Sequence, residues 1–297
     1  MTVTDISSYW ADYELIDSGN FEKLERFGDW VLARPEPQAL WDKSLSEKEW
    51  DNIANARFCK TRSGTGTDNE RGEWKLRKGM PEQWFINYRS DSLSLKFRLG
   101  LTAFKHVGLF PEQAGNWEYI AKAVKGMGGE VKPKVLNLFA YTGGASLAAK
   151  YAGADVTHVD SVRQVVSWSR ENMEASRLND IRWIVEDAVK FVKRELRRNN
   201  TYQGIILDPP AYGRGPDGEK WILEDHLNEL MRNCAELLNP GKGFLVLNLY
   251  SMGYSALIAK NLLQSHFGSA NIEAGELFFT DRSGKRLPLG IFGRIER

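Results

Sequence analysis

The sequence predicts an α/β protein in which a parallel sheet, covered by helices on both faces, follows a small, mostly β domain. From about residue 132, short apolar runs alternate with longer segments whose apolar residues recur at helical spacing, which is the pattern of repeated strand–helix units. The runs VLNLF, GIILD and FLVLNL are apolar almost throughout, as expected of strands buried on both faces. Residues 1–107 carry short extended runs instead, so we expect the mostly β domain there and the sheet domain at 108–297.

Each element of the larger domain can be bounded from its apolar pattern and its flanking turn residues. Strands are expected at 135–139, 156–159, 181–185, 204–207 and 244–249. Helices are expected at 144–152, 161–176, 188–198, 223–238 and 255–267. Two further extended stretches, 272–280 and 287–294, predict an antiparallel hairpin added at the edge of the sheet.

The helix expected at 223–238 has the clearest periodicity. One face carries its apolar residues, namely Leu223, Leu227, Leu230, Met231, Cys234, Leu237 and Leu238. The turn sequence Asn239-Pro240-Gly241 then ends the helix. Because Cys234 lies within this apolar stripe, we expect a core thiol there rather than a nucleophile.

In the N-terminal domain, strict alternation of apolar and polar residues over 93–101 predicts a half-buried strand. Two further runs, 30–33 and 84–88, also have strand composition. Between them, the polar and glycine-rich segment 62–72 predicts a hairpin tip or a mobile loop.

Composition excludes several classes of protein. The 297 residues contain no run of 18 apolar residues, and the N-terminus lacks the basic and apolar regions of a secretory signal, so we expect a cytoplasmic protein without membrane contact. The two cysteines, Cys59 and Cys234, are far apart and predict neither a disulfide framework nor a metal site. With 40 basic and 39 acidic residues, any binding of nucleic acid requires a local patch.

Candidate ligand-binding residues follow the expected strands, because ligands of open α/β sheets bind beyond the carboxyl ends of the strands. The adjacent glycines Gly143 and Gly144 allow a tight turn and close approach to a ligand, although an ordinary strand–helix turn has the same composition. Asp160 follows the next strand at a spacing suited to binding ribose hydroxyls, with a helix cap as the alternative. Asp187 either accepts the adenine amine or caps the following helix.

The sequence Asp208-Pro209-Pro210 after the fourth strand is the most specific signal. The two prolines end the strand and fix the loop, which leaves the Asp208 carboxyl and the Pro209 carbonyl to accept hydrogen bonds from a planar base. A dinucleotide cofactor is disfavoured, because the first strand is followed by AYTGGAS and not by G-x-G-x-x-G.

At these residues the chain resembles class I S-adenosylmethionine (SAM) dependent methyltransferases, and most of all the bacterial large-subunit (23S) ribosomal RNA cytosine-C5 methyltransferase family and its uncharacterised relatives. The matching stretches are KHVGLFPEQAGNW, VLNLFAYTGGASLAAKYAGADVTHVDSV, VEDA and LDPPAYGRG. The resemblance implies a Rossmann-like, seven-stranded methyltransferase sheet, SAM as cofactor, and no metal.

The resemblance also implies which residues contact the donor. Phe110 and Gln113 belong to a segment that runs past the SAM pocket, Asp160 holds the ribose and Asp187 the adenine. The methionine end is lined by Asn137, Phe139, Tyr141, Thr142 and Gly143, and Ser161 and Asp208 complete the expected donor contacts. On the acceptor side we expect Asp208 and Pro209 to hold the base, with Tyr212 stacking on it or orienting it.

Family members that make 5-methylcytosine use a cysteine near the end of the fifth strand, where this chain reads Leu249-Tyr250-Ser251. Cysteine-dependent carbon methylation is therefore not expected, and the target atom stays open. The function expected is in-line methyl transfer to a base of RNA, most of all ribosomal RNA. The alternatives are a protein or small-molecule methyltransferase with the same core and a non-catalytic, SAM-binding RNA-binding protein. The oligomeric state is also open.

Overall fold

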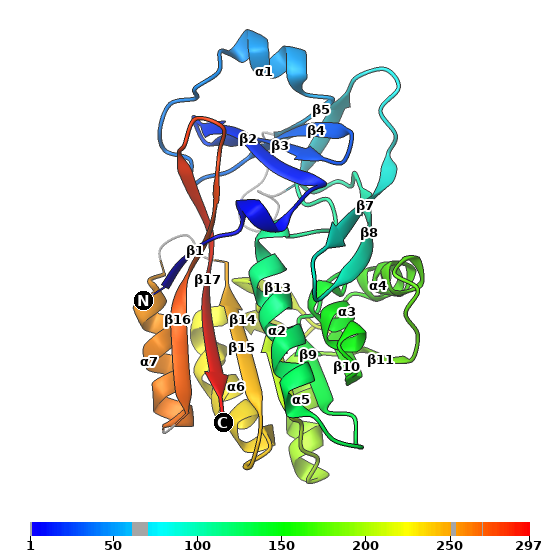
Figure 1. Ribbon diagram of the computed structural model, residues 1–297, viewed down its shortest axis with the longest axis vertical. Coiled ribbons are helices and arrows are strands. Elements are labelled where there is room, and N and C mark those ends of the chain that lie inside the picture. The colour runs from blue at the N-terminus through cyan, green and yellow to red at the C-terminus, as the bar shows by residue number, and fades with distance from the viewer. Residues whose placement is uncertain (1, 61–70, 251–253, 269) are drawn as a thin grey trace.

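The computed structural model describes residues 2–60, 71–250, 254–268 and 270–297. Its largest feature is an eight-stranded sheet in the order β1-β16-β17-β15-β12-β9-β10-β11 (Figure 1). Its strands are β1 (Thr2–Asp5), β9 (Lys134–Leu138), β10 (Asp155–Asp160), β11 (Ile181–Val185), β12 (Gly204–Leu207), β15 (Phe244–Leu249), β16 (Asn271–Thr280) and β17 (Arg286–Glu296). Strands β9 to β12 and β15 are parallel, and β17 runs antiparallel to β15 and β16.

Helices cover both faces of this sheet and enclose two hydrophobic clusters. They are α2 (Ala114–Met127), α3 (Gly144–Tyr151), α4 (Arg163–Ala175), α5 (Ala188–Arg197), α6 (Leu223–Leu237) and α7 (Ala256–Phe267). Successive strand residues alternate between the clusters: Phe244 and Val246 pack with α2 and α3, whereas Leu245 and Leu247 pack with α5, α6 and α7. This alternation explains why the central strands are apolar at almost every position.

The N-terminal part forms a second, five-stranded sheet in the order β2-β3-β4-β5-β6. Its strands are β2 (Tyr13–Gly19), β3 (Glu22–Phe27), β4 (Trp30–Pro35), β5 (Ala56–Lys60) and β6 (Gly72–Leu76), and the helix α1 (Glu47–Ile53) joins β4 to β5. A separate hairpin consists of β7 (Gln83–Arg89) and β8 (Ser94–Gly100). Two single 3-10 turns, Ser7–Tyr9 and Pro111–Gln113, and a small hairpin of β13 (Tyr212–Arg214) and β14 (Lys220–Ile222) complete the described elements.

The β16–β17 hairpin extends beyond the large sheet and reaches the N-terminal sheet (Figure 1). At its tip, Lys285 donates to Asp17 at 3.1 Å, and Ser18 donates to Asp281 at 2.9 Å. Strand β1 pairs with β16 in turn, so the first residues of the chain belong to the large sheet. The expected N-terminal domain therefore does not include residues 2–5, and the seven-stranded methyltransferase sheet has an eighth strand.

The α/β fold class is confirmed, and the boundaries of β11, β12 and β15 coincide with the predicted ones. The apolar stripe of α6 is buried as expected, including Cys234, except that Leu227 is half-buried. Helix α2 and the β13–β14 hairpin were not predicted. The predicted loop at 62–72 lies mostly outside the described residues, and Gly72 already belongs to β6. Among the described residues, no helix is both long and apolar enough to span a membrane.

The linker between the two parts packs closely on α4. Gly108 has a φ of +95°, and a Cβ added there would lie 2.2 Å from Cζ2 of Trp168. The indole of Trp168 donates to the carbonyl of Arg98 at 2.9 Å, so the ring is held in place by the end of β8. Gly108 therefore provides both the left-handed backbone and the space for Trp168.

We expect Gly108→Ala to lower the free energy of unfolding by about 2–5 kcal/mol, from backbone strain of about 1–2 kcal/mol and overpacking of about 1–3 kcal/mol. Gly79→Ala is the matched control, because Gly79 has a φ of +93° but nothing within 4 Å of the added Cβ. Urea denaturation of both variants measures the difference. Equal losses of unfolding free energy in the two variants would show that overpacking against Trp168 contributes nothing to the destabilisation.

Candidate active site

The order of the strands places a cavity at the switch point of the large sheet. From β9 the chain proceeds to β10 on one side and later returns to β12 on the other, so the loops after β9 and β12 diverge and leave a crevice. Eight of the residues expected to contact the donor line this cavity: Phe110, Gln113, Asn137, Phe139, Tyr141, Thr142, Gly143 and Asp208. Asp160, Ser161 and Asp187 lie after the neighbouring strands, outside its lining.

The loop after β9 has an unusual backbone. Phe139 and Tyr141 have φ values of 53° and 47°, and Gly143 has a φ of 91°. The left-handed region costs a non-glycine residue about 1–2 kcal/mol, so contacts must stabilise this loop. The Thr142 hydroxyl donates to the Gly108 carbonyl at 2.7 Å, and Asn172 on α4 donates to the Thr142 carbonyl at 2.9 Å.

Asp160 provides a further anchor for the same loop. Its carboxyl oxygens accept the backbone N–H groups of Tyr141 and Val162, both at 2.9 Å. Burial raises the pKa of Asp160, while these backbone hydrogen bonds oppose that rise. Each carboxylate oxygen has a second lone pair, so the group can anchor the loop and still accept from a ligand hydroxyl.

Asp187 caps α5: its Oδ1 accepts from the backbone N–H of Lys190 at 2.9 Å, as a side chain at a helix N-cap does. Of the two roles predicted for Asp187, binding adenine or capping the helix, the structure shows the helix cap. Ser161 is half-buried in the turn that follows β10. The two residues lie at the ends of adjacent strands.

The two adjacent glycines after β9 are required for different structural reasons. Gly143 adopts the left-handed conformation. A Cβ on Gly144, which also lines the cavity, would instead lie 2.6 Å from Cζ2 of Trp117, so Gly144 makes room for α2. Trp117 itself lines the cavity together with Asn116. Neither was predicted, because no helix was expected over Ala114–Met127.

A neutral polar network lies beneath the loop. The Asn137 amide donates to the Ser146 hydroxyl at 2.9 Å, and that hydroxyl lies 3.0 Å from Nδ1 of His158. Burial lowers the pKa of His158 to about 3, so the imidazole is uncharged at neutral pH. His158 therefore supports the loop as a neutral hydrogen-bonding group.

Asp208 and Asn248 form the polar wall at the end of β12 and β15. Asn248 donates from Nδ2 to Asp208 Oδ1 at 2.7 Å. Burial raises the pKa of Asp208 to about 6, and this hydrogen bond only partly offsets the effect. The buried Oδ1 of Asn248 has no hydrogen-bond partner among the described residues, and it lies near Gly290 of β17, where an added Cβ would be 3.3 Å away.

Asn248 was missed as a site residue, although the sequence carries a signal for it. Its strand FLVLNL and the earlier strand VLNLF each place one asparagine near the carboxyl end of an otherwise apolar run. A polar residue in a strand buried on both faces requires a hydrogen-bonding partner, and a ligand is one candidate.

The two remaining residues expected at the acceptor side differ in exposure. Pro209 is buried, and the following carbonyl, of Pro210, accepts from the indole of Trp221 at 2.6 Å. Trp221 also packs on Phe139, with ring centroids 4.8 Å apart. Tyr212 is 61% exposed at the start of β13 and does not line the cavity. The described residues contain no group of three or more potential metal ligands.

Comparison with known proteins agrees with this geometry. A family model described as S-adenosylmethionine-dependent methyltransferase matches residues 70–282. A crystal structure of a SAM-dependent methyltransferase from Agrobacterium tumefaciens is 39% identical, with a TM-score of 0.88 over 100% of this chain and 93% of that one.

Ribosomal RNA large subunit methyltransferase K/L from Pseudoalteromonas atlantica is 29% identical over 234 residues, which are 73% of this chain and 31% of that protein. The protein of the same name from Shewanella oneidensis is 31% identical over 150 residues, covering 49% of this chain and 20% of that protein. The chain thus spans about a third or less of these curated relatives. The family match itself extends from β6 to the tip of the β16–β17 hairpin, and the chain belongs to the S-adenosylmethionine-dependent methyltransferases.

Proposed function

We propose that this enzyme transfers the methyl group of SAM to a base of RNA, and that ribosomal RNA is its substrate. The observation that carries the proposal is the buried carboxyl of Asp208 at the edge of the donor cavity, followed by two prolines that hold the loop rigid. The names of the two K/L relatives support ribosomal RNA as the substrate class. A cytoplasmic location accords with such a substrate.

For the donor, we propose contacts from three groups of residues. Asn137, Asn248 and the loop 139–143 hold the methionine end. Asp160 and Ser161 bind the ribose, and Asp187 binds the adenine amine with the carboxyl oxygen that does not cap α5. Phe110 and Gln113 close the cavity from the linker. When bound, SAM supplies a methyl group activated by the sulfonium.

For the acceptor, we propose that Asp208 and the Pro209 carbonyl accept hydrogen bonds from the base and align it for in-line attack, which is the main contribution an enzyme makes to such a displacement. Tyr212 contacts the nucleotide from the exposed hairpin, and the N-terminal domain recognises the RNA around it. A nitrogen acceptor is favoured over a carbon that needs thiolate attack. Cys234 is buried in α6, burial raises its pKa, and neither cysteine lines the donor cavity.

The basic helix α5 is not proposed as an RNA-binding surface. Lys193 pairs with Glu229 at 2.7 Å, Arg194 pairs with Glu186, and Lys190 pairs with Glu219. These cations are already neutralised by carboxylates of the same chain, which weakens their attraction for phosphate.

Donor binding is tested by Asp160→Ala, with Asp155→Ala at the exposed start of the same strand as control. We expect the affinity for S-adenosylhomocysteine to fall at least tenfold in Asp160→Ala, about 1.4 kcal/mol, since both the ribose contact and the loop anchor are lost. Calorimetric titration measures both variants. An unchanged dissociation constant in Asp160→Ala would remove this residue from the site.

The substrate class is tested with SAM labelled in its methyl group. We expect transfer to unmodified, in vitro transcribed large-subunit ribosomal RNA to exceed transfer to free nucleosides and to a protein extract. Preference for the extract would identify a protein methyltransferase instead. Binding of S-adenosylhomocysteine without single-turnover transfer to any of the three would support the non-catalytic alternative.

The role of Asp208 is tested by Asp208→Asn, with Asp225→Asn on the exposed first turn of α6 as control. We expect Asp208→Asn to bind S-adenosylhomocysteine within about threefold of the parent and to lose methyl transfer by about 100-fold or more. In the parent, the rate should rise as the pH increases through about 6, because the ionised carboxylate accepts a hydrogen bond from the base more strongly than the protonated acid does. The control should keep both the rate and its pH dependence. Equal loss of donor binding and turnover would reassign Asp208 to the donor.

A further inference from the structure

The β7–β8 hairpin lies between the N-terminal sheet and helix α4, and both of its edges are held (Figure 1). On the β7 side, Asp12 accepts from the backbone N–H and the side-chain amide of Asn87, at 2.8 and 3.1 Å. On the β8 side, Asn172 of α4 accepts from the backbone N–H of Arg98 at 2.8 Å. Because an isolated two-stranded hairpin is only marginally stable in water, these contacts make it a fixed part of the structure.

One face of this hairpin is buried and the other is exposed to solvent. The buried face packs Ile86, Tyr88 and Phe97 into the main hydrophobic core. The opposite face carries a basic and aromatic set without a carboxylate, namely Phe85, Asn87 and Arg89 on β7 and Ser94, Lys96 and Arg98 on β8. Protein surfaces usually intersperse charges of both signs, so this composition favours a negatively charged partner.

The cations of this face are less neutralised than those of α5. Arg98 pairs with Glu171, and its guanidinium carbon lies 4.2 Å from the ring centroid of Trp168. Lys96 and Arg89, by contrast, are exposed and form no ion pair with another described residue. They are diagonal neighbours across the two strands. Cations without a carboxylate partner attract phosphate groups, because each phosphate that they neutralise releases counterions to the solvent.

Phe85 adds a flat apolar surface between these cations. Its side chain is 49% exposed, the Lys96 ammonium lies 5.0 Å from its ring centroid, and Arg98 lies directly opposite it in the register. A single exposed ring is ordinary on a protein surface. An exposed ring flanked by cations, however, is the arrangement by which proteins bind single-stranded nucleic acid, since bases stack on the ring while phosphates contact the cations.

Short contacts connect this face to the donor cavity. Trp168, over which the Arg98 guanidinium lies, packs against Gly108. The Gly108 carbonyl in turn accepts from Thr142 in the donor-binding loop at 2.7 Å. One side chain and one linker residue thus separate the Arg98 end of the face from the loop that lines the donor cavity.

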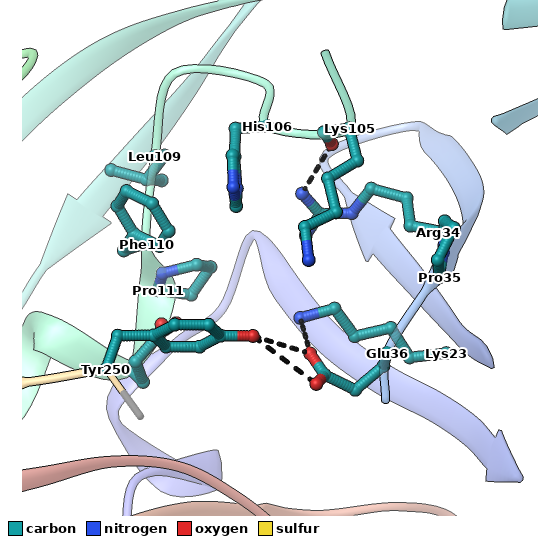
Figure 2. Close-up of a pocket in the computed structure, with 11 residues that line it drawn as sticks. Lys23, Arg34, Pro35, Glu36, Lys105, His106, Leu109, Phe110, Pro111 and Tyr250 are labelled. Atoms are coloured by element: carbon teal, nitrogen blue, oxygen red, sulfur yellow. Dashed lines mark hydrogen bonds and ion pairs between the residues drawn. The ribbon is translucent and has the colours of Figure 1, made fainter. Parts of the chain in front are cut away.

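The contact between the N-terminal sheet and the linker is closed by buried polar groups. The Lys23 ammonium lies 3.2 Å from Glu36, and the Tyr250 hydroxyl donates to the same carboxylate at 3.2 Å (Figure 2). Arg34 donates to the Lys105 carbonyl in the linker at 3.1 Å. These contacts connect β3, β4, the linker and the end of β15, so the hairpin keeps a fixed position relative to the donor cavity.

We infer that the exposed face of the β7–β8 hairpin binds a single-stranded segment of the RNA substrate, with Phe85 stacking on a base and Lys96 and Arg89 contacting phosphates. The inference rests on the proposed function and deepens it, because it assigns RNA recognition by the N-terminal part to one surface. The acceptor base itself stays at Asp208 and the Pro209 carbonyl. The hairpin holds nucleotides beyond that base, so it contributes affinity rather than chemistry.

The test compares Phe85→Ala and Lys96→Gln with two control variants away from this face. One control is Tyr151→Ala, since Tyr151 is an aromatic residue 41% exposed at the end of α3. The other is Lys260→Gln on α7, which packs on β16 and β17 at the opposite edge of the large sheet. Dissociation constants for transcribed large-subunit ribosomal RNA are measured without SAM over a range of salt concentrations.

We expect Phe85→Ala to weaken RNA binding at least about fivefold, through lost stacking, with little change in the salt dependence. Lys96→Gln should lower the salt slope by about one, so that its deficit relative to the parent shrinks about threefold between about 50 and 200 mM salt. Both controls should retain the parent RNA affinity. All four variants should bind S-adenosylhomocysteine within about twofold of the parent, and the two hairpin variants should raise KM rather than lower kcat.

Parent-like RNA affinity in both Phe85→Ala and Lys96→Gln would overturn the inference and leave the proposed function intact. Polyglutamate competing with the ribosomal RNA as well as single-stranded RNA of equal charge does would indicate a partner without bases and would also overturn it. So would a joint loss of melting temperature and donor affinity in both variants, which would show a structural role. RNA binding that depends on Phe85 and Lys96, without methyl transfer by the parent, would support this surface and overturn the proposed function.

Discussion

The shape of the donor cavity depends on how the strained loop after β9 is held. Phe139 and Tyr141 adopt left-handed backbone conformations that a free peptide would leave. The loop is defined by the hydrogen bonds that it donates to the Gly108 carbonyl of the linker and to the Asp160 carboxylate, and by the one that it accepts from Asn172 on α4. The cavity is therefore a property of several packed elements, and changes far from the ligand can alter it.

The polar groups around the donor cavity differ in charge from those at the contact between the two parts of the chain. Beneath the donor cavity, the Asn137–Ser146–His158 network is uncharged, so it orients the loop without adding a field of its own. Asp208 is the carboxyl group in that cavity, and its surroundings leave its ionisation close to physiological pH. Where the N-terminal sheet meets the linker, by contrast, charges of both signs are closely paired, as in Arg34 with Glu25 and Lys23 with Glu36.

Much of the methyltransferase domain could be predicted because its strands are buried on both faces and its helices on one. The apolar runs of β11, β12 and β15 are bounded by glycine, proline and acidic residues, which define their ends. Helix α2 escaped prediction, since its small residues Ala114 and Gly115 follow a proline-containing turn and weaken the periodicity. The buried ion pairs Arg34–Glu25 and Lys23–Glu36 could not be predicted from the sequence either. Their residues come from different segments, and each residue taken alone is typical of a solvent-exposed strand or loop.

The pairing of β1 with β16 has a consequence for how the chain can fold. Thr2 lies opposite Gly275, so β1 and its partner strand β16 are separated by most of the sequence. Contacts this distant in sequence form late, because a very long loop must close before they stabilise anything. The edge of the large sheet and the joint with the N-terminal sheet are thus completed together, after the central strands have assembled. We therefore expect the two parts to melt in one cooperative transition, with no independently stable N-terminal fragment.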